Sequence, residues 1–252
     1  LKTTAVLDGD HYVVNGTKMW TTNGVWAHLA ILTAVVDEAA YRAHPASGVV
    51  HLLMDRSAVD WAVRDLPIIG LKAGTTGEIR FQNCRVPREY LFHDAGEGYR
   101  QNLVVRGWAR ILLGAWAIGL MEAAIADASA WARERITFGK PIAGHQMIQD
   151  LISRMLVDLE TSRLLTYKAA TLMDRGERCD VEQCMAKLHA CEAAQRVTGQ
   201  AIQILGGRGL TTDEGFLTER HYRDARFLTI AEGTSQIMQL IIGRRALGVS
   251  AI

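Results

Sequence analysis

The chain has 252 residues, of which 49% are hydrophobic, and a formal net charge of +1. This length accommodates one large domain or two small ones with an ample core. The balanced charge predicts no nucleic-acid partner, because such proteins carry an excess or a stripe of Lys and Arg. No apolar run approaches the ~20 residues that cross a bilayer, so we expect no membrane span.

The beginning of the chain and its cysteines indicate the compartment. The chain starts at Leu1, without Met and without a charged and apolar leader, which indicates no targeting signal and predicts that upstream residues are absent. The cysteines form no CxxC pair and have no His at zinc-finger spacing, so no metal site is predicted. They are typical of buried or incidental thiols in a reducing compartment: Cys84, Cys179, Cys184 and Cys191.

Residues 1–95 show the short β-rich runs of an antiparallel sandwich or barrel. A hairpin is predicted between residues 11–14 and 17–20, because Asn15-Gly16 tolerates the positive φ angles of a type I′ turn. Further strands are expected at 30–36, 49–54, 61–63 and 79–86. Residues 39–47 are expected to form an exposed loop.

Residues 96–252 are predicted to form a four-helix up-and-down bundle, because the apolar period becomes helical from Gly98. The first helix is expected to reach about Glu134. Gly206-Gly207 should stop the third helix, and the fourth should start at about Thr234. The apolar stripes expected on the first three helices are Leu112, Trp116, Gly119 and Ala123; Ile148, Ile152, Leu156 and Leu159; and Cys184, Leu188, Cys191, Ala194, Val197, Ala201 and Leu205.

Glu232 lies directly before Gly-Thr-Ser-Gln and an apolar helix. Gly233 lets the backbone approach a ligand closely. Thr234 or Ser235 can cap the helix, whose free N–H groups form an anion site. One interpretation is a general base beside a phosphate-binding helix start. The other is a surface glutamate before a capped helix.

Three further motifs each have a structural and a functional interpretation. Met19 to Asn23 places a tryptophan, usually a core residue, beside hydroxyl groups at a strand end. Arg135 to Ile142, closing at His145-Gln146, lies between two helices, where an arginine usually caps a helix. Gln203 to Gly209 is not a dinucleotide fingerprint, because it follows a helix and not a strand; it precedes the run Tyr222-Arg223-Asp224-Ala225-Arg226.

In this order and spacing, the four motifs together resemble the acyl-CoA dehydrogenase family. The resemblance covers essentially the whole chain, as the family's middle β domain (1–95) followed by its C-terminal four-helix domain (96–252). The family's N-terminal helical domain, and the acidic-Pro-Gly-Ser motif expected just before Leu1, are not in this sequence. That segment normally helps to hold flavin and substrate.

The resemblance implies a role for each motif. Glu232 matches the family's catalytic base; some relatives carry that base at the position of Ala109, so alanine there leaves one candidate. Arg110 and Gly233 would lie against the substrate. The FAD-binding residues implied are Trp20, Thr21 and Thr22 at the isoalloxazine, with Thr22 near N5; Thr234, Ser235 and Gln236 of the same subunit; and, largely across a subunit interface, Arg135, Phe138, His145, Gln146, Gln203, Ile204, Leu205, Gly206 and Gly207.

Two positions depart from the family's pattern. Ala231 replaces a larger aromatic residue, and Gly107 lacks a side chain where medium-chain relatives have an acid. Both changes are expected to widen or reshape the acyl pocket, so the acyl chain length stays open.

The implied activity is FAD-dependent α,β-dehydrogenation of an acyl-CoA thioester to the trans-2-enoyl-CoA, a step of fatty acid metabolism. Electrons would pass to an electron-transfer flavoprotein. A homodimer or homotetramer is expected, in the cytoplasm of a bacterium or the mitochondrial matrix of a eukaryote. The alternatives are an oxygen-using acyl-CoA oxidase of the same fold and a non-catalytic or truncated subunit. An acyl carrier protein could also replace CoA.

Overall fold

The computed structural model of this protein describes residues 1–44, 46–92, 97–212 and 215–249. The chain divides into two compact units, Leu1–Val105 and Arg106–Ile252. Each unit has a hydrophobic core of its own. Helix α2 (Gly98–Glu134) begins in the first unit and continues into the second.

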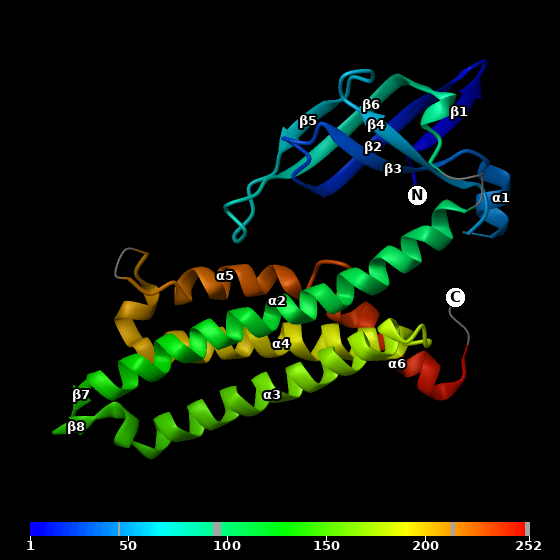
Figure 1. Cartoon of the computed structure of the whole chain (residues 1–252). Coiled ribbons are helices and arrows are strands. Elements are labelled where there is room, and N and C mark those ends of the chain that lie inside the picture. Colours follow the sequence, from blue (N-terminus) through cyan, green and yellow to red (C-terminus); the bar gives the residue numbers. More distant parts are fainter. Residues whose placement is uncertain (45, 93–96, 213–214, 250–252) are drawn as a thin grey trace. The chain divides into compact units, whose positions relative to one another are not determined.

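The first unit is an open, mostly antiparallel sheet in the order β4-β3-β1-β2-β6-β5 (Figure 1). One pair is parallel, β1 with β3, at Thr4 and Val35. The predicted antiparallel β domain is confirmed, while the described strands do not close into a barrel. The strands are β1 (Thr4–Asp8), β2 (His11–Thr22), β3 (Leu29–Val35), β4 (Val49–Asp55), β5 (Ala62–Asp65) and β6 (Thr76–Pro87).

The hairpin predicted at Asn15-Gly16 is wrong, because β2 runs straight through these residues. The tight turn lies earlier, at Gly9-Asp10, where Gly9 has φ 62° and joins β1 to β2. Asn15-Gly16 instead forms a bulge against β6, marked by a register shift between Val14 and Gly16. Gly16 has φ 139°, and a Cβ there would lie 2.7 Å from the backbone of Thr3, so both conformation and space require glycine.

The expected exposed loop at 39–47 contains a short helix, α1 (Glu38–Ala43), which has no buried residue. Position 45 of that expected loop lies outside the described residues. Asp37 caps α1, because its side chain accepts a hydrogen bond from the amide of Ala40 at 2.9 Å. Exposure was therefore predicted correctly, but the N-cap signal at Asp37 was missed.

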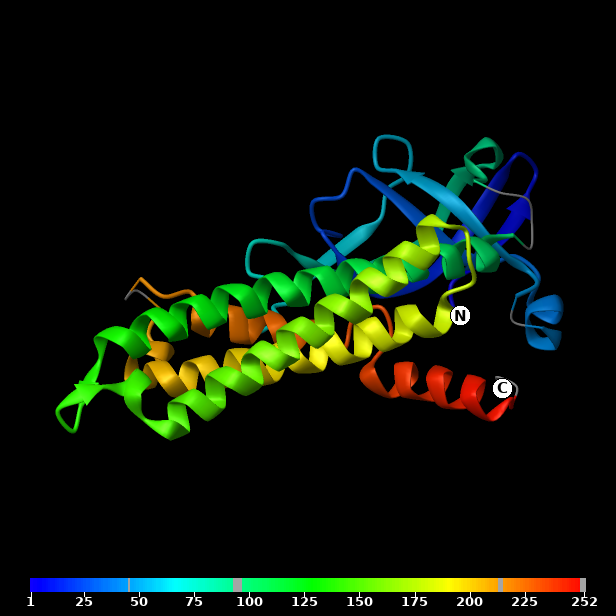
Figure 2. The same ribbon diagram turned by 60° about the horizontal axis from the view of Figure 1, so that its bottom comes forward.

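The second unit contains three long helices that alternate in direction, α2, α3 (Gln146–Asp174) and α4 (Asp180–Leu205) (Figures 1 and 2). Two shorter helices, α5 (Thr218–Leu228) and α6 (Ser235–Leu247), both pack against α4. The predicted helical bundle is confirmed, but α5 was not expected. Shorter elements are η1 (Arg88–Tyr90), β7 (Ile136–Thr137), β8 (Lys140–Pro141), η2 (Ile142–Gly144) and η3 (Gly206–Leu210).

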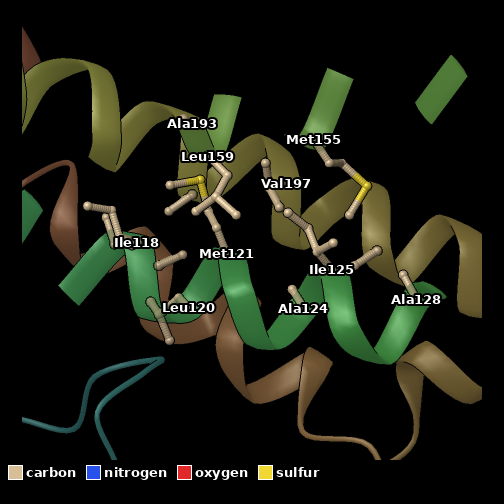
Figure 3. Packing of buried hydrophobic residues seen from close by; sticks show 14 of the residues in the cluster. Ile118, Leu120, Met121, Ala124, Ile125, Ala128, Met155, Leu159, Ala193 and Val197 are labelled. Carbon is tan, nitrogen blue, oxygen red and sulfur yellow. The ribbon is translucent and has the colours of Figure 1, made fainter. Parts of the chain in front are cut away.

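The bundle core is built from small and medium apolar side chains (Figure 3). Met121 and Ala124 of α2 face Leu159 of α3 and Val197 of α4. The stripe predicted for α2 lies on the wrong face: Leu112 is 65% exposed and Trp116 is 41% exposed. Apolar residues occur on every side of this helix. The spacing of its apolar residues therefore could not show which side is buried.

The other predicted stripes are mostly correct. On α3, Ile148 and Ile152 pack against the core and Leu159 is buried, but Leu156 is 45% exposed. On α4 every predicted residue is buried except Leu188, which is half-buried.

By length and composition alone, α2 is apolar enough to cross a membrane. Of its most apolar window, 56% is buried inside the protein. A core helix has the same character, so this is weak evidence for a span.

Candidate functional site

Glu232 lies in the turn between α5 and α6, with its side chain exposed. Its backbone has φ 53°, and that of Gly233 has φ 101°. A left-handed conformation is uncommon for a residue with a side chain, and clusters at functional sites. Among the described residues, no hydrogen bond or ion pair engages the Glu232 carboxylate. The turn therefore presents an unpaired carboxylate to the surface.

The residues after Gly233 start α6. Thr234 is the N-cap, and its hydroxyl accepts a hydrogen bond from the amide of Ile237 at 3.4 Å. Ser235 is buried, and its hydroxyl donates to the carboxylate of Glu192 on α4. Of the two predicted caps, Thr234 is the one that forms, with Gln236 exposed in the first turn. The positive end of α6 thus lies directly beside Glu232.

Lys187 of α4 contacts the same turn and was missed by sequence reasoning. Its side chain is fully buried, and its Nζ donates to the carbonyl oxygen of Gly233 at 2.7 Å. Burial lowers the pKa of this amine from its usual 10.5. The sequence does contain a signal for this residue. Lys187 lies on the apolar stripe of α4, one helical turn from both Cys184 and Cys191, where a lysine is unexpected. Burial also raises the pKa of the Cys191 thiol to about 12, so that cysteine is inert.

Arg110 and Gly107 of α2 face α4. Arg110 is half-buried, its Nε has no hydrogen-bond partner in the described part of the chain, and its charge lowers the pKa of Lys187. A Cβ at Gly107 would lie 2.9 Å from Oε1 of Gln183, so Gln183 fills the space beside this glycine. Ala231 packs against the bundle core.

In the first unit, Trp20, Thr21 and Thr22 lie at the end of β2. Trp20 has φ 62° and is 67% exposed, so the expectation that a tryptophan here belongs to the core is wrong. A second register shift between Lys18 and Thr21 displaces the strand at this point. Thr21 is half-buried and Thr22 is exposed. The bulge therefore turns an aromatic ring outward beside two hydroxyl groups.

Arg135, Phe138, His145 and Gln146 surround a hairpin between α2 and α3. Phe138 and Gly139 have φ 49° and 80°, the two positive angles of a type I′ turn, and join β7 to β8. The ring of Phe138 is 98% exposed and meets His145 edge-on at 6.1 Å between centroids. Arg135 and Gln146 are exposed. This hairpin tip carries its polar and aromatic groups outward.

The stretch Gln203 to Gly207 ends α4. Gly206 is the C-cap with φ 62°, as expected, and a Cβ at Gly207 would meet no atom within 4 Å. Gln203 is exposed, whereas Ile204 and Leu205 are buried and offer only their backbone. The guanidinium of Arg208 lies 4.6 Å from the ring centroid of Trp131, which brings this stretch beside the end of α2.

The second unit therefore carries two groups of predicted site residues at opposite ends. The hairpin and the end of α4 lie at one end, and α6 lies at the other (Figures 1 and 2). From Lys187, which contacts Gly233, to Leu205, α4 rises about 27 Å, at about 1.5 Å per residue. The two groups cannot serve one small ligand within a single copy of this unit.

Two protein-family domain models match successive parts of the chain. Residues 1–84 match the acyl-CoA dehydrogenase middle domain, and residues 96–247 match the acyl-CoA dehydrogenase C-terminal domain. Human mitochondrial short-chain specific acyl-CoA dehydrogenase is 37% identical over 241 residues, which cover 95% of this chain and 57% of that protein.

Solved structures show the same fold. A glutaryl-coenzyme A dehydrogenase in complex with glutaryl-CoA has a TM-score of 0.93 at 34% identity, over 99% of this chain and 62% of its own. The prolyl acyl carrier protein oxidase AnaB has a TM-score of 0.91 at 29% identity, over 99% and 64%. The chain thus spans 57–64% of the length of these proteins. On its sequence and fold, the chain belongs to the acyl-CoA dehydrogenase family.

Proposed function

We propose that this protein catalyses the α,β-dehydrogenation of an acyl-CoA thioester, with Glu232 as the general base. The observation that carries the proposal is the Glu232 carboxylate, exposed and unpaired on a left-handed turn at the start of α6. A base that must reach a substrate proton needs such a position. Two of the named relatives, the human short-chain specific acyl-CoA dehydrogenase and the glutaryl-coenzyme A dehydrogenase, are acyl-CoA dehydrogenases by name, which supports the substrate class.

The residues present fit a flavin nucleotide. Trp20 offers an exposed aromatic surface beside the hydroxyls of Thr21 and Thr22. The capped start of α6 offers the backbone N–H groups of Thr234 and Gln236 to an anion, whereas the Ser235 amide already donates to the carbonyl of Thr229. Open space at Gly207 and an exposed Arg135 suit a diphosphate. When bound, FAD would supply the acceptor for the hydride from the β-carbon.

Two residues of the chain then have defined tasks in the reaction, Glu232 and Arg110. Glu232 takes the α-proton of the thioester, while the electron pair of the broken α-C–H bond forms the new double bond. The backbone N–H of Glu232 stabilises the charge that develops on the thioester oxygen. Arg110, whose Nε has no hydrogen-bond partner among the described residues, would bind the substrate from α2. The product is the trans-2-enoyl thioester, and the two electrons leave through an electron-transfer flavoprotein.

We also propose a homodimer or homotetramer. Lys187, which contacts Gly233, and Leu205, at the end of α4 beside the hairpin group, are about 27 Å apart along α4, at about 1.5 Å per residue. Two copies of the chain would bring one group of each copy to a shared FAD. This explains why residues assigned to one cofactor lie at both ends of one unit.

The test is an anaerobic titration of the full-length protein, loaded with FAD, against a panel of acyl-CoA thioesters. Bleaching of the oxidised flavin band by a saturated acyl-CoA is the expected result. A flavin that no thioester reduces would contradict the assignment and favour a non-catalytic subunit.

An oxygen-using oxidase is the second candidate, favoured by the likeness to AnaB. Reoxidation in air distinguishes the two. A dehydrogenase should hold its reduced flavin in air while product is bound and should turn over with an electron-transfer flavoprotein. Rapid oxygen consumption with peroxide release would indicate the oxidase. Including acyl carrier protein thioesters in the same titration panel shows whether CoA or an acyl carrier protein carries the acyl group.

A further inference from the structure

Lys187 is the largest side chain that is fully buried in the described structure. The residues around it on α4 are the buried Cys184, Ala186, Ala190 and Cys191. A lysine in such surroundings is costly unless its amine has a strong partner. Its hydrogen-bond partner among the described residues is the carbonyl oxygen of Gly233, the residue after Glu232. A packing role alone would be met by methionine or leucine.

Glu192 contacts the same turn from one helical turn further along α4. Its carboxylate accepts the hydroxyl of Ser235, and the Ser235 amide donates to the carbonyl of Thr229 at 3.0 Å. The backbone from Gly233 to Ser235 is thus attached to α4 at two points, on either side of Thr234. A rigid helix here holds a turn that has two left-handed residues.

We propose that Lys187, together with Glu192, forms a clamp on the turn Glu232–Ser235, and that Lys187 is a positioning residue for the Glu232 carboxylate. This inference rests on the proposed function of Glu232. Lys187 does not contact the substrate. It fixes the Gly233–Thr234 peptide, one residue after Glu232, so that the carboxylate points to one place.

The chemistry requires such a device. Glu232 has no partner of its own among the described residues, so its direction depends on the backbone that carries it. A left-handed residue relaxes to the common regions of φ and ψ unless its surroundings prevent it. Displacement of a reacting group by about 1 Å can cost about 100-fold in rate. The clamp prevents that relaxation without blocking the base.

The direct test is hydrogen exchange, measured by mass spectrometry on full-length protein with and without Lys187→Met. Methionine keeps the length and apolar contacts of the side chain but donates nothing to Gly233. The amides of Ser235, Ile237 and Met238, which are bonded within the turn, should exchange roughly 10- to 100-fold faster, since a charged hydrogen bond is lost. The core of α4 around Val197 should stay protected.

The matched control is Lys168→Met, which removes an exposed lysine from α3. It should leave exchange in the turn unchanged. Ser235→Ala removes the second attachment, the hydroxyl that donates to Glu192, and should loosen the turn in the same direction. Unchanged exchange in the turn with Lys187→Met overturns the clamp. So does loss of protection throughout the helical unit, because Lys187 would then be needed for folding.

Kinetics separate the clamp from the function it serves. With Lys187→Met, flavin reduction by acyl-CoA should fall at least about ten-fold, while the affinity for enoyl product stays the same. If wild-type protein is reduced by no thioester but Lys187→Met still loosens the turn, the proposed function fails and the clamp stands. If the variant matches wild type in both exchange and reduction rate, the clamp fails and the function stands.

Discussion

The hydroxyl of Thr218 donates to the carboxylate of Asp127 at 2.9 Å, between residues that are 91 positions apart. Thr218 is fully buried at the start of α5, and Asp127 lies in the last third of α2. The buried apolar residues of α5 are Ala225 and Leu228, and Phe227 packs against the bundle core. The hydrogen bond from Thr218 to Asp127 adds a polar link from the start of this helix, which leads into the Glu232 turn, to α2.

Thr218→Val should destabilise the helical unit, because the half-buried Asp127 carboxylate loses a donor while the shape of the Thr218 side chain is kept. We expect a loss of about 1–3 kcal/mol, measured by urea unfolding. Thr161→Val is the control, since the Thr161 hydroxyl donates to the carbonyl of Val157 within its own helix. Equal unfolding midpoints for the two variants would show that the Thr218–Asp127 bond adds nothing.

Glu232→Gln keeps the size and hydrogen-bonding capacity of the side chain and removes its basicity. General bases contribute about 10²–10⁴-fold in rate, so flavin reduction by acyl-CoA should fall by at least that range. Stopped-flow spectroscopy on full-length protein measures it. FAD content and enoyl-CoA binding should survive in the same preparation. Reduction at nearly the wild-type rate would remove Glu232 as the base.

Arg135→Ala and Gly207→Glu should both weaken FAD retention while the fold stays intact. A new side chain at Gly207 meets no atom within 4 Å, so its effect comes from added negative charge near the bound diphosphate. We expect about 10- to 100-fold weaker binding from the lost or opposed charge, measured by fluorescence of released FAD. Gly119→Glu, where a Cβ also meets nothing, is the control. Unaltered affinity in both test variants would refute the cross-subunit site.

Glu78 provides a test of acid stability in the β unit. Arg64 and Arg80 donate to its nearly buried carboxylate, and the hydrogen bond from Arg64, then that from Arg80, lowers its pKa from 4.5. A folded-state pKa below the unfolded value stabilises the protein above pH 4.5, and this contribution disappears as the pH falls through the lower, folded-state pKa.

Glu78→Gln should accordingly lower the urea midpoint at neutral pH, and the gap to wild type should close as the pH falls below 4.5. The exposed Glu89→Gln serves as the comparison and should show no such closing gap. A gap of the same size at every pH would mean that charge at Glu78 does not matter.

Local sequence signals predicted the ends of the helices well at positions where the residue present is favoured for a single physical reason. Gly206 ends α4 because its positive φ of 62° favours glycine. Thr234 begins α6 because its hydroxyl accepts a hydrogen bond from a backbone amide of the first turn. The start of α2 at Gly98 and its end at Glu134 were read from the change of period. The Glu232 motif was found because its order relative to the other motifs was specific.

The errors arose where distant contacts decide between two local possibilities. Asn15-Gly16 suits a turn or a bulge, and the hydrogen bond from the Asn83 amide to the Asn15 side chain, at 2.8 Å, belongs to the bulge. The partner strand, 68 residues away, is invisible to a local pattern. The buried face of α2 depends on which helices cover it. Lys187 was overlooked because a lysine is normally placed at the surface.

The distance between the two ends of the helical unit has a genetic consequence. If each FAD takes Glu232 from one copy and Arg135 from another, two defective chains can complement one another. In a mixed dimer of Glu232→Gln and Arg135→Ala chains, one site would carry both lesions and the other would carry none. Co-expression of two inactive alleles would then restore activity that neither allele has alone.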